Sequence, residues 1–265
     1  MQMPIHLADH YYDPNKKYCG LYIVAKMELP AFGPTTELIR IFDKRAIPLL
    51  TINSHTKDGN VYNFLMVDLT DKEGAKEEIV EEIKTVFANR LVYFRCIDTG
   101  IKGFIYNING FPLIFNFSNN HSQAAALTAS TWKTLIMGIV KRYGVGASVI
   151  LWYMGNDAGE GKARIMMGLQ GLSNVEMVKI GLARLQSLGW GRFDLIECDE
   201  LGKRVVIRVF DNFEEMITKE LLDYQNSFLK GFLVGLISTI FGKACRGIEV
   251  KCVNKGDPYC EFLLR

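Results

Sequence analysis

The chain is poor in the residues from which many catalytic centres are built. It has only 4 histidines in 265 residues, and no serine or cysteine has a plausible histidine base. It also lacks a glycine-rich dinucleotide fingerprint after an expected strand and a phosphate-binding loop that ends in Gly-Lys-Ser or Gly-Lys-Thr. We therefore expect a protein that is not an enzyme.

Excess charge and long apolar runs are scarce as well. A net charge of +2 provides no general attraction to nucleic acid, so we expect no direct nucleic-acid partner. The longest apolar run, Phe232 to Phe241, is too short to cross a bilayer and predicts a buried helix instead. The first residues lack the pattern of a secretory signal peptide, and the 6 cysteines are scattered apart from the last three. These features favour a reducing, cytoplasmic location.

The composition is that of a folded protein with proper cores. Hydrophobic residues make up 49% of the chain and charged residues 23%, in a length that suits one large or two ordinary domains. Gly100, Gly103, Gly110 and Pro112 punctuate the linking stretch, and we place the boundary between Thr99 and Phe111. The expected domains are residues 1–105 and 106–265, both of the α+β class.

The first domain is predicted to have a βαββαβ order, as in a ferredoxin-like unit. An unpatterned arm from Met1 to Lys17 precedes it. Asp58-Gly59 predicts a hairpin turn between the second and third strands, and the second helix has an apolar face that includes Ile79, Ile83, Val86 and Phe87. The expected strands are residues 19–27, 47–54, 61–68 and 91–97, and the expected helices are residues 34–42 and 71–88.

The turn Pro30-Ala31-Phe32-Gly33-Pro34 lies between the first strand and the first helix. With this turn, the unit resembles an ACT domain, a small regulatory module. The resemblance implies that Phe32 and Gly33 lie where free N–H groups at a helix N-terminus can receive a ligand carboxylate. A structural or dimerising role of the unit is the alternative.

The second domain is predicted to be a layer of helices on an antiparallel sheet. Glycines at 155, 159 and 161 predict a helix break or loop within residues 146–167. The expected helices are residues 123–143, 146–167, 174–188 and 221–241, and the expected strands are residues 191–198 and 204–210, followed by a hairpin at the C-terminus.

This terminal hairpin is predicted by two β-rich runs that flank Lys255-Gly256-Asp257-Pro258. If the loop is centred near Gly256, Cys252 and Cys260 are opposite each other, with Cβ atoms roughly 4.5–5.5 Å apart. The two sulfur atoms are then close enough to hold one metal ion or to form a disulfide.

The motif Glu249-x-x-Cys252, followed by Gly256-Asp257-Pro258-x-Cys260-x-Phe262, resembles the C-terminal signature of the 4-vinyl-reductase, or hydrocarbon-binding, domain family. The turn at Trp190 is similar to that family too. The resemblance implies a fold related to NO-signalling domains and to subunits of the Golgi transport particle. In sensor members it implies a zinc ion held by a glutamate, two cysteines and a further cysteine on the preceding helix.

The fourth ligand position is occupied here by Asn226 or Ser227, and a closed zinc site needs four ligands. Zinc held by Glu249, Cys252, Cys260 and either Cys245 or water is therefore one state of the site. Reduced thiols that fill a small core, and a disulfide, are the other two. Glu249 lies an odd number of residues from Cys252, so it can coordinate only if the strand bends or bulges between them.

The family resemblance also implies an apolar cavity for an aromatic or acyl ligand. Bulky side chains that could line it are Trp132, Trp152, Trp190, Phe228 and Phe232, although each could simply fill the core. We expect a sensor or adaptor, homodimeric and with a possible protein partner, that binds a small hydrophobic molecule. The alternatives are a dimeric interaction module without an exchangeable ligand and a vinyl-reductase component that receives its reductant from a partner.

Overall fold

The computed structural model divides the chain into two compact units, Met1–Ala124 and Ala125–Arg265. It describes residues 10–27, 33–72, 74–97, 99–107, 113–117, 120–199, 201, 204–219, 221 and 224–265. The sequence places the boundary earlier, between residues 105 and 106. The difference is the hairpin of β7 (Leu113–Phe117) and β8 (Asn120–Ala124), whose strands pair with each other and are grouped with the first unit.

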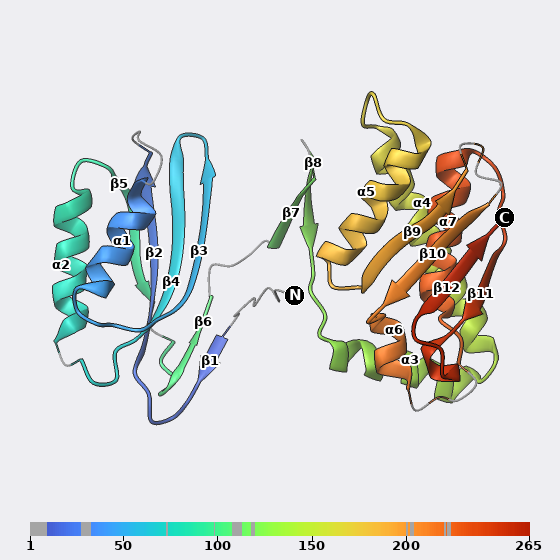
Figure 1. Cartoon of the computed structure of the whole chain (residues 1–265). Helices are drawn as coiled ribbons and strands as arrows, with labels where there is room; N and C mark the ends of the chain where they lie inside the picture. Colours follow the sequence, from blue (N-terminus) through green and yellow to red (C-terminus); the bar gives the residue numbers. More distant parts are fainter. Residues whose placement is uncertain are drawn as a thin grey trace. The chain divides into compact units, whose positions relative to one another are not determined.

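The first unit has the predicted βαββαβ order (Figure 1). Its antiparallel sheet has the strand order β3-β4-β2-β5. The first and last strands of the βαββαβ order, β2 and β5, are therefore adjacent. The turn at Asp58-Gly59 is confirmed, with φ values of 50° and 72°. The elements are β2 (Tyr18–Lys26), α1 (Gly33–Asp43), β3 (Leu49–Lys57), β4 (Asn60–Asp68), α2 (Ala75–Phe87) and β5 (Leu91–Ile97).

Helices α1 and α2 cover one face of this sheet and enclose the main core of the unit. Ile79, Ile83 and Phe87 of α2 are buried as predicted, whereas Val86 is 38% exposed. Val86 follows Ile83 by three residues and precedes Phe87 by one, so it falls at the edge of the apolar stripe rather than in it.

A two-stranded ribbon that the sequence did not predict packs against the opposite side of the sheet. It pairs β1 (His10–Tyr12) with β6 (Phe104–Tyr106), so part of the expected arm is a strand. Ile105 of β6 is buried in a second cluster with Phe64, Met66 and Ile97. Gly20 makes room for the ribbon, because a Cβ there would lie 3.1 Å from Cδ1 of Ile105.

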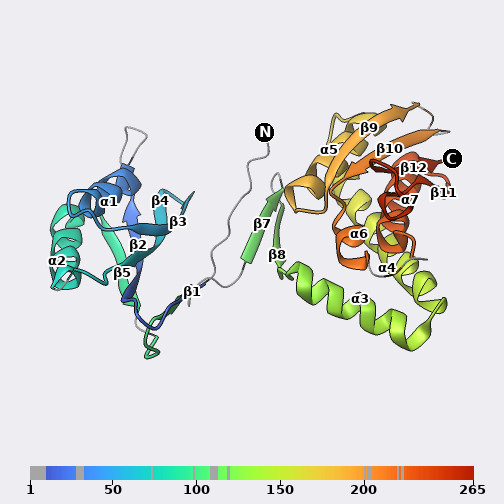
Figure 2. The same ribbon diagram turned by 60° about the horizontal axis from the view of Figure 1, so that its bottom comes forward.

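The second unit is a layer of helices on an antiparallel sheet, as predicted (Figures 1 and 2). The strand order β11-β12-β10-β9 places the terminal hairpin beside β10. The strands are β9 (Arg192–Cys198), β10 (Val205–Phe210), β11 (Gly247–Lys251) and β12 (Cys260–Leu264). The helices are α3 (Ala129–Tyr143), α4 (Gly146–Met167), α5 (Asn174–Ser187), α6 (Phe213–Thr218) and α7 (Ser227–Phe241).

Two helices differ from the prediction. Helix α7 begins at Ser227 rather than at Leu221, and the unpredicted short helix α6 precedes it. Helix α3 begins at Ala129, where the Thr128 side chain accepts a hydrogen bond from the Thr131 N–H and so caps the helix. In the part of the chain that the structure describes, no helix is both long and apolar enough to span a membrane.

Helix α4 is continuous, so the predicted break at its glycines is wrong. Gly155 and Gly159 lie against α7, where a Cβ would approach the carbonyl oxygens of Phe228 and Phe232 to 2.0 and 2.1 Å. Gly231 and Gly235 of α7 are equally close to α4. Each helix therefore contributes a small-x-x-x-small pair, which allows the two backbones to touch. The glycines serve close packing, and this outweighs their low helix propensity.

Adding one methyl group at this contact tests its importance. We expect Gly159→Ala to lower the free energy of unfolding by about 1–3 kcal/mol, because the new Cβ must push the backbones apart. Gly161→Ala is the matched control in the same helix, since nothing lies within 4 Å of its Cβ position. It should raise stability by about 0.5–1 kcal/mol. Urea unfolding followed by circular dichroism measures both, and equal effects would contradict the contact.

Candidate functional site

The site includes the short helix α6, whose N-terminus is fixed by a hydrogen bond to the side chain of its own N-cap residue. The side-chain oxygen of Asn212 accepts a hydrogen bond of 3.1 Å from the N–H of Glu214 and so caps the helix. This cap places the two following acids, Glu214 and Glu215, inside the unit, where they are 0% and 4% exposed. Buried carboxylates need hydrogen-bond donors or cations around them.

Glu215 points toward the terminal hairpin. Its Oε2 accepts from Sγ of Cys260 at 2.9 Å, and its Oε1 lies 3.5 Å from Sγ of Cys252. The backbone N–H of Asn254 donates to the same Oε1 at 2.7 Å. Glu215, Cys252 and Cys260 each have one possible ligand atom within 4.8 Å of those of the other two, and all three residues are buried. This Glu-Cys-Cys cluster could hold a metal ion.

The protonation state of the thiols follows from their surroundings. Burial, together with Glu249 and Glu215, raises the pKa of Cys252 to about 11. Burial and the hydrogen bond to Glu215 raise the pKa of Cys260 as well. Without a cation both sulfurs are therefore protonated donors at neutral pH. The N–H groups of Asn254 and Val253 act in the opposite direction and favour the thiolates that a metal requires.

Glu249 is on the same side of the hairpin as the cysteines. The strand register shifts between Glu249 and Lys251, so Glu249 is opposite Phe262 and faces the buried side. This is the bulge that coordination by Glu249 would need. Its carboxylate, however, accepts a hydrogen bond of 2.5 Å from Nδ2 of Asn226. Glu249 thus borders the cluster, and Glu215 is the carboxylate inside it.

The other predicted positions around the thiols are also located. Cys245 lies outside the cluster, with its Sγ 3.0 Å from Oγ of Ser238. Asn226 rather than Ser227 is directed at the cluster, with Nδ2 3.6 Å from Sγ of Cys260. An amide donor thus occupies the place where the family resemblance implies a fourth cysteine. Cys252 and Cys260 form no disulfide in the structure.

Glu214 points away from the thiols and toward α7. Its two oxygens accept hydrogen bonds from the N–H groups of Phe228 and Leu229 at 2.9 and 2.7 Å. The hydroxyl of Tyr224 donates to it at 2.6 Å. Burial raises the pKa of Glu214 to about 7, although these three donors oppose the rise. The carboxylate stabilises the N-terminus of α7, where a negative charge is favourable.

Four of the five predicted aromatic residues come together with Phe213 of α6, which the sequence did not single out. The ring of Trp190 lies 5.1 Å from those of Phe213 and Phe232, measured between centroids. The other ring pairs of this group have centroids 5.6–6.4 Å apart, the spacing of packed aromatic rings. The members of this aromatic cluster are Trp132, Trp190, Phe213, Phe228 and Phe232.

Trp152, by contrast, has its ring against that of its neighbour Tyr153 on α4, with centroids 5.0 Å apart. In the first unit, Gly33 begins α1 with a φ of 27°. Phe32, the other residue of the proposed ACT-like turn, lies outside the described residues.

Helix α3 covers the aromatic cluster but is itself lightly packed. Ile136 is its only buried residue, and Trp132, Ile139 and Val140 are partly buried against the cluster. Figure 2 shows α3 along the periphery of the second unit, next to α6. Such a helix has few buried contacts to lose on a local displacement.

The chain matches no protein-family model. It also matches none of the curated proteins. The chain is similar in structure to the phenol-responsive sensory domain of the transcription activator PoxR, solved with phenol. The sequence identity is 20% and the TM-score is 0.50. The match covers 54% of this chain and 76% of that domain. Part of the chain therefore has the fold of this sensory domain.

Two further solved structures are similar at lower scores. A vinyl-4-reductase family protein from Methanocaldococcus jannaschii is 18% identical over 54% of this chain and 83% of its own, with a TM-score of 0.38. The ACT domain from GTP pyrophosphokinase of Chlorobium tepidum is 17% identical over 31% of this chain and 99% of its own, with a TM-score of 0.27.

Proposed function

We propose that the unit Ala125–Arg265 binds a small hydrophobic molecule, aromatic or acyl, and that the chain is a non-enzymatic sensor or adaptor. The observation that carries the proposal is the aromatic cluster beneath α3, a helix with one buried residue. We assign to this unit the fold shared with the phenol-responsive domain of PoxR, which supports the same function. A vinyl-reductase role would require a reductant from a partner, and we do not favour it.

The aromatic cluster suits an apolar guest. Its rings already contact one another through faces and edges, so a flat apolar molecule can replace one ring contact with another at little cost. Entry requires space that α3 can provide, because this helix buries one of its own side chains, Ile136, and buries Trp132, Ile139 and Val140 only in part. We infer that α3 shifts when the ligand enters between it and α6.

A shift of α3 also provides an output. It is the first helix after the division between the units at Ala124 and Ala125. Any displacement of α3 therefore acts directly on the segment that joins the two units along the chain. We propose that the ligand alters assembly or partner contacts by this route.

Tryptophan fluorescence can test ligand binding because the chain has 3 tryptophans. In Trp152→Phe, only the two tryptophans of the aromatic cluster remain as reporters. We expect phenol, indole and short acyl compounds to change this fluorescence saturably, and the binding compound to raise the melting temperature. Trp132→Phe in the same background should lose part of the signal. A panel without any saturable response or thermal shift would refute the proposal.

We also propose that the Glu-Cys-Cys cluster binds zinc as a structural ion. Glu215, Cys252 and Cys260 provide three ligands of the types that zinc prefers, and backbone N–H groups of Val253 and Asn254 already favour the thiolate forms. Glu249 and a water molecule are the candidates for the fourth ligand. The ion would join α6 to the terminal hairpin and stabilise the sheet edge.

Cobalt in place of zinc reports on sulfur ligands through its charge-transfer absorption. We expect this absorption with the reduced wild-type chain and at least about tenfold weaker binding in Cys252→Ser and Glu215→Gln, which each remove one ligand. Cys245→Ser is the control, because Cys245 lies with Ser238 outside the cluster. Equal losses in all three variants, or no absorption with free thiols, would count against the metal site.

A dimeric interaction module is the second candidate function, and exposed apolar residues favour it. Val145, Val149 and Tyr153 follow one another at four-residue spacing at the start of α4 and are 91%, 57% and 59% exposed. Leu135 of the neighbouring α3 is 48% exposed. An apolar stripe of this kind is a usual site of association, and a second copy of the chain would cover it.

The oligomeric state tests this candidate. We expect the wild-type chain to sediment as a dimer and Val149→Asp with Tyr153→Asp to sediment as a monomer, because buried unpaired charges oppose association. Met167→Asp, at the far end of the same helix and 52% exposed, should remain dimeric. A monomeric wild-type chain would exclude the interaction module as stated.

A further inference from the structure

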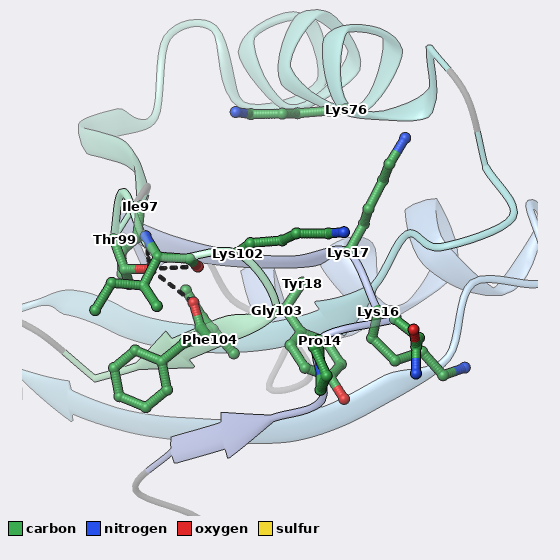
Figure 3. Close-up of a pocket in the computed structure, with 13 residues that line it drawn as sticks. Pro14, Lys16, Lys17, Tyr18, Lys76, Ile97, Thr99, Lys102, Gly103 and Phe104 are labelled. Carbon is green, nitrogen blue, oxygen red and sulfur yellow. Dashed lines mark hydrogen bonds between the residues drawn. The ribbon is translucent and has the colours of Figure 1, made fainter.

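The first unit contains a hollow with a different chemistry from the aromatic cluster. Its volume is about 500 Å³, within the range of small-molecule sites. It lies between the segment before β2, the start of α2 and the segment from Thr99 to Ile105 (Figure 3). We infer that this hollow binds a small phosphate ester that carries an apolar group.

The charge of the lining is one-sided. The lining residues that the structure describes number 13, and they include four lysines and no aspartate or glutamate. Lys16 forms an ion pair of 3.0 Å with Asp68. Lys17, Lys76 and Lys102 have no ion pair within the described residues. A chain with a net charge of only +2 thus places four lysines around one hollow, and three of them are outside the ion pairs of the described residues.

The three lysines come from separate segments that border the hollow. Figure 3 shows Lys76 of α2 on one side of the hollow and Lys17 and Lys102 on the other. Glu77 and Glu78 follow Lys76 in α2 but are not among the lining residues. Like charges around one concavity repel one another, and an anion bound between them removes this cost.

The floor of the hollow is fixed in place. The N–H of Asp13 donates to the carbonyl of Gly103 at 2.9 Å, an approach that a Cβ at Gly103 would block, since it would lie 2.0 Å from the Asp13 oxygen. The hydroxyl of Thr99 donates to the carbonyl of Phe104 at 2.7 Å. The N–H of Lys17 donates to Oγ1 of Thr70 at 2.9 Å. A preorganised wall of this kind lowers the cost of binding.

The rest of the lining determines the class of ligand. Apolar and aromatic side chains lie beside the lysines, so the site offers more than a counter-ion contact. A phosphate group satisfies several ammonium groups at once, and an attached apolar group covers the hydrophobic part of the wall. The apolar and aromatic lining residues are Pro14, Tyr18, Ile97, Ile101, Phe104 and Ile105.

Calorimetry with the full chain and three probes tests the inference. We expect 1-naphthyl phosphate to bind about tenfold or more tightly than either inorganic phosphate or 1-naphthol. The triple variant Lys17→Gln, Lys76→Gln, Lys102→Gln should lose at least tenfold in affinity for it. Ile101→Ser should weaken 1-naphthyl phosphate but not inorganic phosphate. These side chains are exposed, so circular dichroism should show unchanged folding.

Lys57→Gln is the matched control, since Lys57 is an exposed lysine of β3 that does not line the hollow. An equal loss in this variant, equal affinity for the phosphate ester and inorganic phosphate, or no binding would overturn the inference. Binding of 1-naphthol by the second unit is separable, because the lysine variants leave it unchanged.

A phosphate ester with an apolar part can be a free metabolite or a lipid headgroup. Phosphatidylcholine vesicles that contain phosphatidic acid distinguish the two sources. Sedimentation of the wild-type chain with these vesicles, lost in the triple lysine variant, would identify the lipid form of the ligand. Binding of 1-naphthyl phosphate without sedimentation would identify the free form.

Discussion

Two neighbouring carboxylates on α6 hold the second unit together. Glu214 accepts the N–H groups at the start of α7, and Glu215 accepts the thiols and backbone of the terminal hairpin. The residue before them, Phe213, belongs to the aromatic cluster. Three consecutive residues thus join the apolar core, the central helix and the cysteine cluster. Because Phe213, Glu214 and Glu215 are all buried, a change in the packing of one of these regions also alters the contacts of the other two.

Periodicity predicted most of the architecture. The βαββαβ order, the continuous pairing at Asp58-Gly59 and the terminal hairpin depend on local patterns of apolar and turn residues, which the sequence displays directly. The β1–β6 ribbon depends on pairing between residues about ninety positions apart, and no local pattern of three residues specifies such a partner. The glycines of α4 predict a break when only the local sequence is considered, because their packing partner, α7, lies far along the chain.

The site was predicted in part, for a physical reason that its residues show. Cys252 and Cys260 are close because a hairpin brings near residues together. Glu215 reaches them from α6, outside the hairpin, and the motif around Glu249 does not include any residue of α6. A signal did exist: Asp211-Asn212 after a strand, followed by two acids, is a helix start with an N-cap. Sequence spacing predicted the position of Asn226. Its hydrogen bonds to Glu249 and Cys260 depend on the tertiary fold and could not be predicted.

The contact between α4 and α7 divides the second unit into a fixed part and an adjustable part. Their backbones touch, so neither helix can slide or rotate along the other without a collision between main-chain atoms. Helix α3 meets its neighbours through side chains that can change rotamer. The four glycines at this contact have only a hydrogen atom as a side chain, and for this reason α4 and α7 form the fixed frame of the unit. In the proposed function, α3, which lies outside this frame, is the helix that adapts to guests of different shape.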